Sequence, residues 1–105
     1  MALSDYQKQV DKWVTDNNYS YWSPHEILAR VTEETGELAR LINHVYGPKK
    51  KKLEEHKQDL GEEISDIIWA LASLANVHNI NLDESFQQVL DKAYDRDSQR
   101  FAKTE

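Results

Sequence analysis

The sequence predicts an all-α protein built as a four-helix-type bundle. Turn-forming residues are scarce, with three glycines and two prolines in 105 residues, and a sheet would need more of them at its turns. Apolar residues recur at spacings of three and four in four separate stretches, which is typical of amphipathic helices. We expect one domain, residues 1–105, because a chain of this length encloses a single core.

The composition excludes several classes of protein. A net charge of −6 argues against a nucleic-acid polymer as partner. The chain has no cysteine, which excludes disulfides and thiolate zinc sites. The longest apolar run, residues 67–72, is too short to span a bilayer, and residues 1–5 lack the pattern of a signal peptide. We expect a soluble, cytoplasmic protein that binds no membrane.

The first two predicted helices have recognisable ends. The first is expected to begin with Ser4 as its N-cap and to end near Asn17. Residues 23–26 read Ser-Pro-His-Glu, in which the serine caps, the proline fits the first turn and the glutamate closes a capping box. This second helix ends before Gly47. The residues expected to face inward are Tyr6, Val10, Trp13, Val14, Ile27, Val31, Leu38, Leu41, Ile42 and Val45.

The last two predicted helices carry wider apolar surfaces. The third begins between Leu53 and Gln58 and ends near His78, and the fourth follows a second capping box at residues 81–84. The residues expected to face inward are Leu60, Ile64, Ile67, Leu71, Leu74, Leu82, Phe86, Val89, Leu90 and Ala93. Trp69 widens the apolar surface of the third helix beyond one stripe, which predicts subunit packing.

Two acidic pairs lie on the second and third predicted helices. Glu34 and Glu37 are three residues apart and share a helix face, as do Glu63 and Asp66. Both pairs fall within the apolar stripes, where ionised carboxylates are costly unless a cation pairs with them. Magnesium prefers oxygen ligands, and manganese can substitute for it. We interpret the four residues as a magnesium site; the alternative is two solvated helix faces in a chain with 19 acidic residues.

Two groups of basic residues have alternative interpretations. Lys92, Arg96 and Arg100 repeat every four residues along the fourth predicted helix. They either pair with neighbouring aspartates at the surface or donate hydrogen bonds to phosphate oxygens. Residues 49–52 are four lysines, which we interpret as a solvated loop, with a flap over an anionic ligand as the alternative.

Several familiar chemistries lack their residues in this chain. The sequence contains neither a glycine-rich phosphate loop nor a HExxH motif. No histidine follows a glutamate at the spacing of the di-iron bundles. Metal-assisted chemistry on an oxygen-rich, phosphorylated substrate remains.

The acidic motifs carry a resemblance to a known family. Residues 33–39 and 62–66 resemble the EExxE…ExxD motif of the MazG-like all-α nucleoside triphosphate pyrophosphohydrolases. The similarity continues in residues 74–76, 80–86, 92–97 and 100–101. The resemblance implies magnesium-dependent cleavage of a (deoxy)nucleoside triphosphate between its α- and β-phosphates. The products would be a nucleoside monophosphate and pyrophosphate, and the role would be house-cleaning of the nucleotide pool. The enzyme would be a homodimer or homotetramer.

The resemblance also implies roles for individual residues. Glu33, the first glutamate of the motif, would orient or deprotonate the attacking water. Trp22 and His44 are candidates for holding the base, with ordinary packing as the alternative. The expected metal ligands are Glu34, Glu37, Glu63 and Asp66. The residues expected to hold the phosphate chain are Lys92, Arg96 and Arg100.

Two other functions are compatible with the sequence. The protein could be a non-catalytic helical interaction module whose acidic clusters bind a structural cation or a basic partner. Such a module needs neither Glu33 nor the three basic residues of the fourth predicted helix. The same chemistry could also act on a phosphoribosyl nucleotide.

Overall fold

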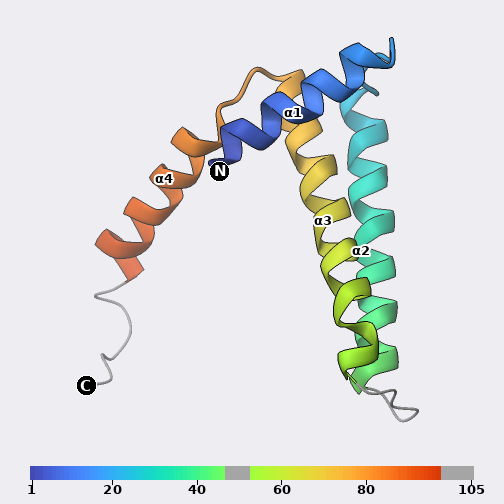
Figure 1. The fold of residues 1–105 in the computed structure, drawn as a ribbon. Coiled ribbons are helices and arrows are strands. Elements are labelled where there is room, and N and C mark those ends of the chain that lie inside the picture. Colours follow the sequence, from blue (N-terminus) through green and yellow to red (C-terminus); the bar gives the residue numbers. More distant parts are fainter. Residues whose placement is uncertain (47–52, 98–105) are drawn as a thin grey trace.

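In the computed structural model of the protein, residues 1–46 and 53–97 are described, apart from the side chains of residues 53–58 and 97. These residues form four α-helices and one π-helical turn, with no strand among them (Figure 1). The elements are α1 (Leu3–Asp16), α2 (Pro24–Tyr46), α3 (Leu53–Val77), α4 (Leu82–Lys92) and η1 (Ala93–Asp97). The predicted all-α class is therefore confirmed. The lysines at 49–52 and Arg100 lie outside the described residues.

Capping side chains fix the starts of α2 and α4 as predicted. The Glu26 amide donates to Ser23 Oγ at 3.3 Å, and Ser23 Oγ donates to Glu26 Oε1 at 2.9 Å. Asn81 Oδ1 accepts hydrogen bonds from the amides of Asp83 and Glu84 at 2.9 and 3.2 Å. Each cap satisfies amides that have no partner within the helix.

The predicted start of α1 is wrong by a few residues. The helix begins at Leu3, with Ala2 as the N-cap, and Asp5 Oδ2 accepts the Ala2 amide at 2.9 Å. The Ser4 amide instead donates to Asp83 Oδ1 on α4 at 3.1 Å. Hydrogen bonds from Ser4 lower the pKa of Asp83. A tertiary partner thus replaces the local cap that the sequence suggested.

The helices form an open arrangement (Figure 1). The long helices α2 and α3 run antiparallel side by side, and α1 packs across α3 near its C-terminal end. Among the described elements, α4 packs on α1 and projects away from the α2–α3 pair. Within a single chain, therefore, α1 joins the α2–α3 pair but α4 leaves one side of the bundle open. None of the described helices combines the length and hydropathy that a membrane span requires.

Three alanines of α3 make half of the buried apolar core. Among the described residues, the buried apolar side chains are Val10, Ile27, Val45, Ala70, Ala72 and Ala75. The prediction that Ile64 and Leu71 face inward is wrong for the single chain, since they are 44% and 45% exposed. Alanines allow helices to approach closely, so the larger side chains beside them are left at the flanks.

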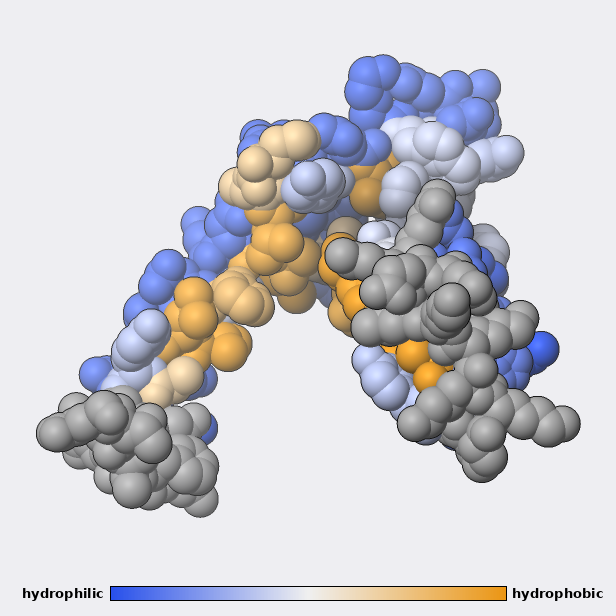
Figure 2. Space-filling view, turned by 60° about the horizontal axis from the view of Figure 1, so that its bottom comes forward, coloured by the Kyte–Doolittle hydropathy of each residue, from blue (hydrophilic) through white to orange (hydrophobic). Residues whose placement is uncertain are grey.

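An apolar surface lies on the inner side of the open arrangement. Figure 2 shows hydrophobic residues gathered between α4 and the α2–α3 pair. α4 carries exposed apolar side chains that were expected to face inward, among them Phe86 and Val89, which are 53% and 60% exposed. A groove of about 440 Å³ between α1 and α3 adds Leu3, Tyr6 and Ile68. An apolar surface of this kind marks an interaction site.

Gly61→Ala is expected to stabilise the protein. Gly61 lies within α3, and a Cβ built there meets no atom within 4 Å. Glycine costs a helix interior about 1 kcal/mol relative to alanine, so thermal denaturation should show a Tm about 4–6 °C higher. Ala39→Gly, at an exposed position of α2, is the matched control and should lower Tm by a similar amount. A lower Tm for Gly61→Ala would mean that another surface packs on this position.

Candidate active site

Three carboxylates from α2 and α3 converge. Glu34, Glu37 and Glu63 each offer one oxygen, and these oxygens lie within 4.8 Å of one another. Glu34 is only 2% exposed, Glu63 is half-buried and Glu37 is exposed. The antiparallel pairing of the two long helices produces this cluster, because the two acidic motifs meet at the same level of the pair. We call these three residues the carboxylate cluster.

Part of the cluster has no partner within the described residues. Glu34 Oε2 and Glu63 Oε2 are both buried and accept no hydrogen bond. Burying such oxygens without a partner is unfavourable. Convergent carboxylate oxygens are the ligands that hard divalent cations prefer. The residues present therefore fit a divalent cation.

Arg30 provides the one ion pair with the cluster that the described residues show. Its Nη2 lies 2.8 Å from Glu34 Oε1, one turn away along α2. Arg30 was not predicted as a site residue, and it lies outside both acidic motifs. The spacing of four residues was the available signal, since such residues are neighbours on a helix. Arg30 neutralises only part of the charge that the cluster gathers.

Burial is the main reason that the pKa values of Glu34 and Glu63 are raised. For Glu34, the Arg30 guanidinium opposes the rise in pKa, while the charges of Glu37 and Asp66 add to it. For Glu63, the neighbouring carboxylates, Glu37 first, all add to the rise. The cluster thus gathers more negative charge than its protein surroundings stabilise, which favours binding of a cation.

The metal-free protein is expected to lose stability as pH rises above about 4.5, the ordinary pKa of these carboxyls. An acid with a higher pKa in the folded state stabilises folding when protonated, and this contribution is lost as pH rises through the folded-state pKa. Tm measured in EDTA from about pH 5 to about pH 8 checks this. A Glu34→Gln/Glu63→Gln double variant should show a shallower decline. A decline as steep as that of the wild type would contradict the assignment.

The other two predicted acidic residues are exposed. Asp66 follows Glu63 by one turn and is close enough to raise the pKa of Glu34 and Glu63. It is not one of the three residues whose oxygens converge within 4.8 Å. Glu33 lies on α2, one turn before Glu37, and does not belong to the carboxylate cluster.

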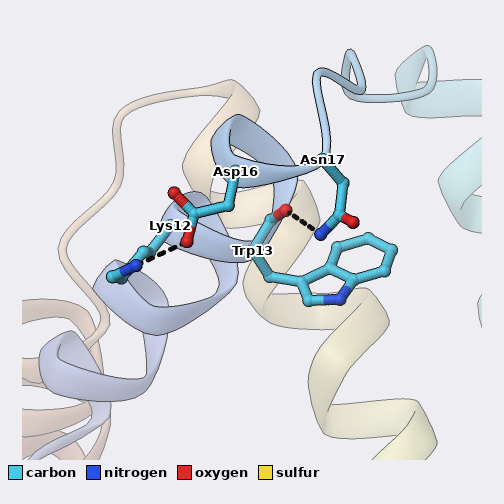
Figure 3. Close-up of polar contacts among 4 residues, drawn as sticks. All are labelled: Lys12, Trp13, Asp16 and Asn17. Carbon is cyan, nitrogen blue, oxygen red and sulfur yellow. Dashed lines mark hydrogen bonds and ion pairs between the residues drawn. The ribbon is translucent and has the colours of Figure 1, made fainter.

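An aromatic cavity of about 710 Å³ opens beside the cluster. The Trp13 ring meets the ring of Tyr19 at 5.2 Å and that of Trp69 edge-on at 5.4 Å, centroid to centroid. Asn17, the C-cap of α1, donates a hydrogen bond from Nδ2 to the Trp13 carbonyl at 2.8 Å (Figure 3). The side chains that line both the cavity and the edge of the cluster are Arg30 and Asp66.

The structure separates the remaining predicted site residues. Trp22 lines the aromatic cavity. His44 is exposed in the last turn of α2 and is not among the residues that line the cavity. Lys92 and Arg96 lie on α4 and η1, which project away from the α2–α3 pair (Figure 1). Within the described part of one chain, these two cations are not brought to the carboxylate cluster.

The aromatic cavity was not predicted from the sequence. Trp13 was assigned to the core and Trp69 to a subunit contact, but both line the cavity. The signal that was available was the run of aromatic residues just before the second helix, Tyr19, Tyr21 and Trp22. That run indicates a cavity only when the position of α3 beside it is known.

A carboxylate cluster beside an aromatic cavity, on a pair of long helices, is the arrangement of an all-α protein that can hold a metal ion next to an aromatic ligand. Residues 22–101 match the family model of the MazG nucleotide pyrophosphohydrolase domain. The chain belongs to this family and is a nucleotide pyrophosphohydrolase. The family resemblance predicted from the acidic motifs is confirmed.

Similar proteins come from Bacillus. YpjD of Bacillus subtilis strain 168 is 41% identical over 104 residues, which cover 99% of this chain and 94% of YpjD. The crystal structure of YpjD from Bacillus subtilis matches with a TM-score of 0.78 and 40% identity, covering 91% of this chain and 96% of that one. A Bacillus-conserved MazG protein, a nucleotide pyrophosphohydrolase, matches with a TM-score of 0.77 and 34% identity, covering 91% and 93%.

Proposed function

We propose that the protein cleaves (deoxy)nucleoside triphosphates between the α- and β-phosphates in a magnesium-dependent reaction. The products are a nucleoside monophosphate and pyrophosphate, and the role is house-cleaning of the cytoplasmic nucleotide pool. The observation that supports this proposal is the carboxylate cluster, in which one buried oxygen each of Glu34 and Glu63 has no hydrogen-bond partner. The cluster lies beside a cavity that is large enough for a base.

The proposed mechanism divides the work among the acidic residues. Magnesium, or manganese in its place, supplies neutralisation of the negative charge that spreads over the phosphates during the reaction. The residues that would hold the ion are Glu34, Glu37, Glu63 and Asp66. Arg30 orients Glu34 through their 2.8 Å ion pair. Glu33 orients the attacking water or takes its proton.

The proposal places the base in the aromatic cavity. Asp66 and Arg30 line the cavity and also interact with the cluster. A nucleotide can therefore extend its phosphates to the carboxylates while its base contacts the aromatic rings. Trp22 is the proposed stacking partner, because its ring is 55% exposed and lines the cavity. His44 lies too far along α2 to share that role.

The proposal includes assembly into a homodimer or homotetramer. Figure 2 shows an apolar surface beside α4. Among the described residues, Phe86 and Val89 of α4 are left exposed. Packing of α4 on a second copy would bury these side chains. It would also place Lys92, at the end of α4, and Arg96, on η1, against another subunit, where the phosphates can accept their hydrogen bonds. Sedimentation velocity measures the assembly, and a fully active monomer would contradict this part of the proposal.

A nucleotide panel with magnesium tests the reaction. Each canonical nucleoside triphosphate, a set of altered bases and a phosphoribosyl nucleotide are incubated with the enzyme, and the products are separated by ion exchange. Monophosphate and pyrophosphate in equal amounts are expected, and the relative rates identify the base. Monophosphate with orthophosphate alone would reject cleavage between the α- and β-phosphates. Magnesium binding without turnover of any nucleotide would favour the interaction module.

A further inference from the structure

The connector between α1 and α2 forms one wall of the aromatic cavity. Residues 19–22 all line it. The amides of Asn18 and Tyr19 donate back to carbonyls of α1 at 3.0 and 2.9 Å, which holds the start of the connector. Among the described residues, no main-chain hydrogen bond is made by residues 20–22. Between this end and the Ser23 cap of α2, the wall that carries Trp22 therefore depends on side chains for its position.

The side chain of Tyr21 provides that attachment. Its hydroxyl donates to Asp11 Oδ1 on α1 and accepts a hydrogen bond from Asn76 Nδ2 on α3 at 3.0 Å. Burial and the hydrogen bond to Asp11 raise the pKa of Tyr21 to about 12. The hydroxyl is thus a protonated donor throughout the neutral range. One side chain joins the connector to two helices.

The attachment continues into a buried amide network. Asn76 Nδ2 also donates to the Gln7 carbonyl at 3.0 Å, and Asn76 Oδ1 accepts from Gln7 Nε2 at 3.0 Å. Gln7 is 6% exposed, and it also donates to the Ile80 carbonyl at 2.7 Å and accepts the Leu82 amide at 2.9 Å. Every side-chain polar group of Gln7 has a partner. Fully satisfied buried networks of this kind are rigid.

We infer that Tyr21 is a positioning residue for the nucleotide: its hydrogen bonds to Asp11 and Asn76 hold the connector so that Trp22 faces the cavity. This inference rests on the proposed function, which gives the cavity to the base. A wall that is ordered before binding loses less conformational entropy when the ligand arrives. Without the hydroxyl, the connector would have to be ordered by the nucleotide itself. The effect should appear in binding rather than in the chemical step.

The substitution Tyr21→Phe keeps the ring and removes only the hydroxyl. With the best nucleotide of the panel, KM should rise about fivefold to tenfold, the usual effect of one lost hydrogen bond, while kcat stays within about twofold. Amide hydrogen exchange in residues 18–22 of the ligand-free protein should become faster. Tyr46→Phe, an exposed tyrosine at the far end of α2, is the control and should change neither quantity.

The acceptor is tested separately. Asp11→Asn keeps an oxygen for the Tyr21 hydroxyl and should retain the wild-type KM, whereas Asp11→Ala should reproduce the Tyr21→Phe result. Unchanged KM and unchanged exchange in Tyr21→Phe, with an active wild type, would overturn the inference and leave the proposed function intact. A loss confined to kcat would overturn it as well. A wild-type protein that hydrolyses no nucleotide would overturn both.

Discussion

Glu63→Gln is expected to lower kcat about 10³-fold. Glu63 supplies one of three convergent oxygens, and its second oxygen is buried without a partner. An amide presents only one acceptor to a cation and carries no charge. Charge stabilisation by a bound metal contributes several kcal/mol to the transition state, and each 1.4 kcal/mol corresponds to about tenfold in rate. Steady-state kinetics at a magnesium concentration that saturates the wild type measures the loss.

The neighbouring residue supplies a matched control for Glu63→Gln. Glu62 is exposed on α3 and does not belong to the carboxylate cluster, so Glu62→Gln should keep kcat within about twofold. Calorimetry should show magnesium binding to Glu62→Gln and not to Glu63→Gln. In EDTA, Glu63→Gln should melt above the wild type, because the amide can donate a hydrogen bond to the neighbouring carboxylates. Wild-type magnesium affinity in Glu63→Gln would reject the cluster as the metal site.

Trp22→Ala is expected to raise KM by about tenfold to 100-fold. Stacking of one base on an aromatic ring contributes about 1–3 kcal/mol, and the chain offers Trp22 on the wall of the cavity. The ring is 55% exposed, so its removal opens no cavity in the core. The Tm of the variant should therefore stay within about 2 °C of the wild type. Kinetics with the preferred nucleotide separates the effect on KM from that on kcat.

Two further variants test whether a rise in KM comes from the loss of base stacking on Trp22. Trp22→Phe keeps an aromatic face and should recover most of the affinity. His44→Ala removes the other side chain that the sequence suggested for the base, and it should leave KM unchanged because His44 is not among the residues that line the cavity. A higher KM in His44→Ala than in Trp22→Ala would move the base toward the end of α2.

Much of the fold could be predicted from interactions between residues that are close together in the sequence. The caps at Ser23 and Asn81 use partners within three residues, so their helices begin where the sequence indicates. The predicted start of α1 was wrong because the amide of Ser4 donates a hydrogen bond to Asp83, which is 79 residues away in the sequence. The inward residues of α3 were partly wrong because periodicity identifies the apolar face of a helix, but not which part of that face lies closest to its neighbours.

The candidate site, too, could be predicted only where its pattern lies within a single helix. The carboxylates were predicted because their spacing places charges on an apolar stripe, an anomaly that is visible within each helix. The aromatic cavity combines Trp13, Trp22 and Trp69, which lie on α1, on the connector and on α3. No local pattern brings these residues together. The position of Lys92 and Arg96 depends on what covers α4, which one sequence does not specify.

The aromatic cavity gives the protein a built-in optical reporter. The chain has three tryptophans, and all of them, Trp13, Trp22 and Trp69, line this one cavity. The tryptophan fluorescence of the whole molecule therefore originates from the wall of the proposed base site. A stacked nucleotide base would quench that emission directly, so ligand affinity can be titrated without labels. With Glu63→Gln, the same titration would follow a nucleotide that is hydrolysed far more slowly than by the wild type.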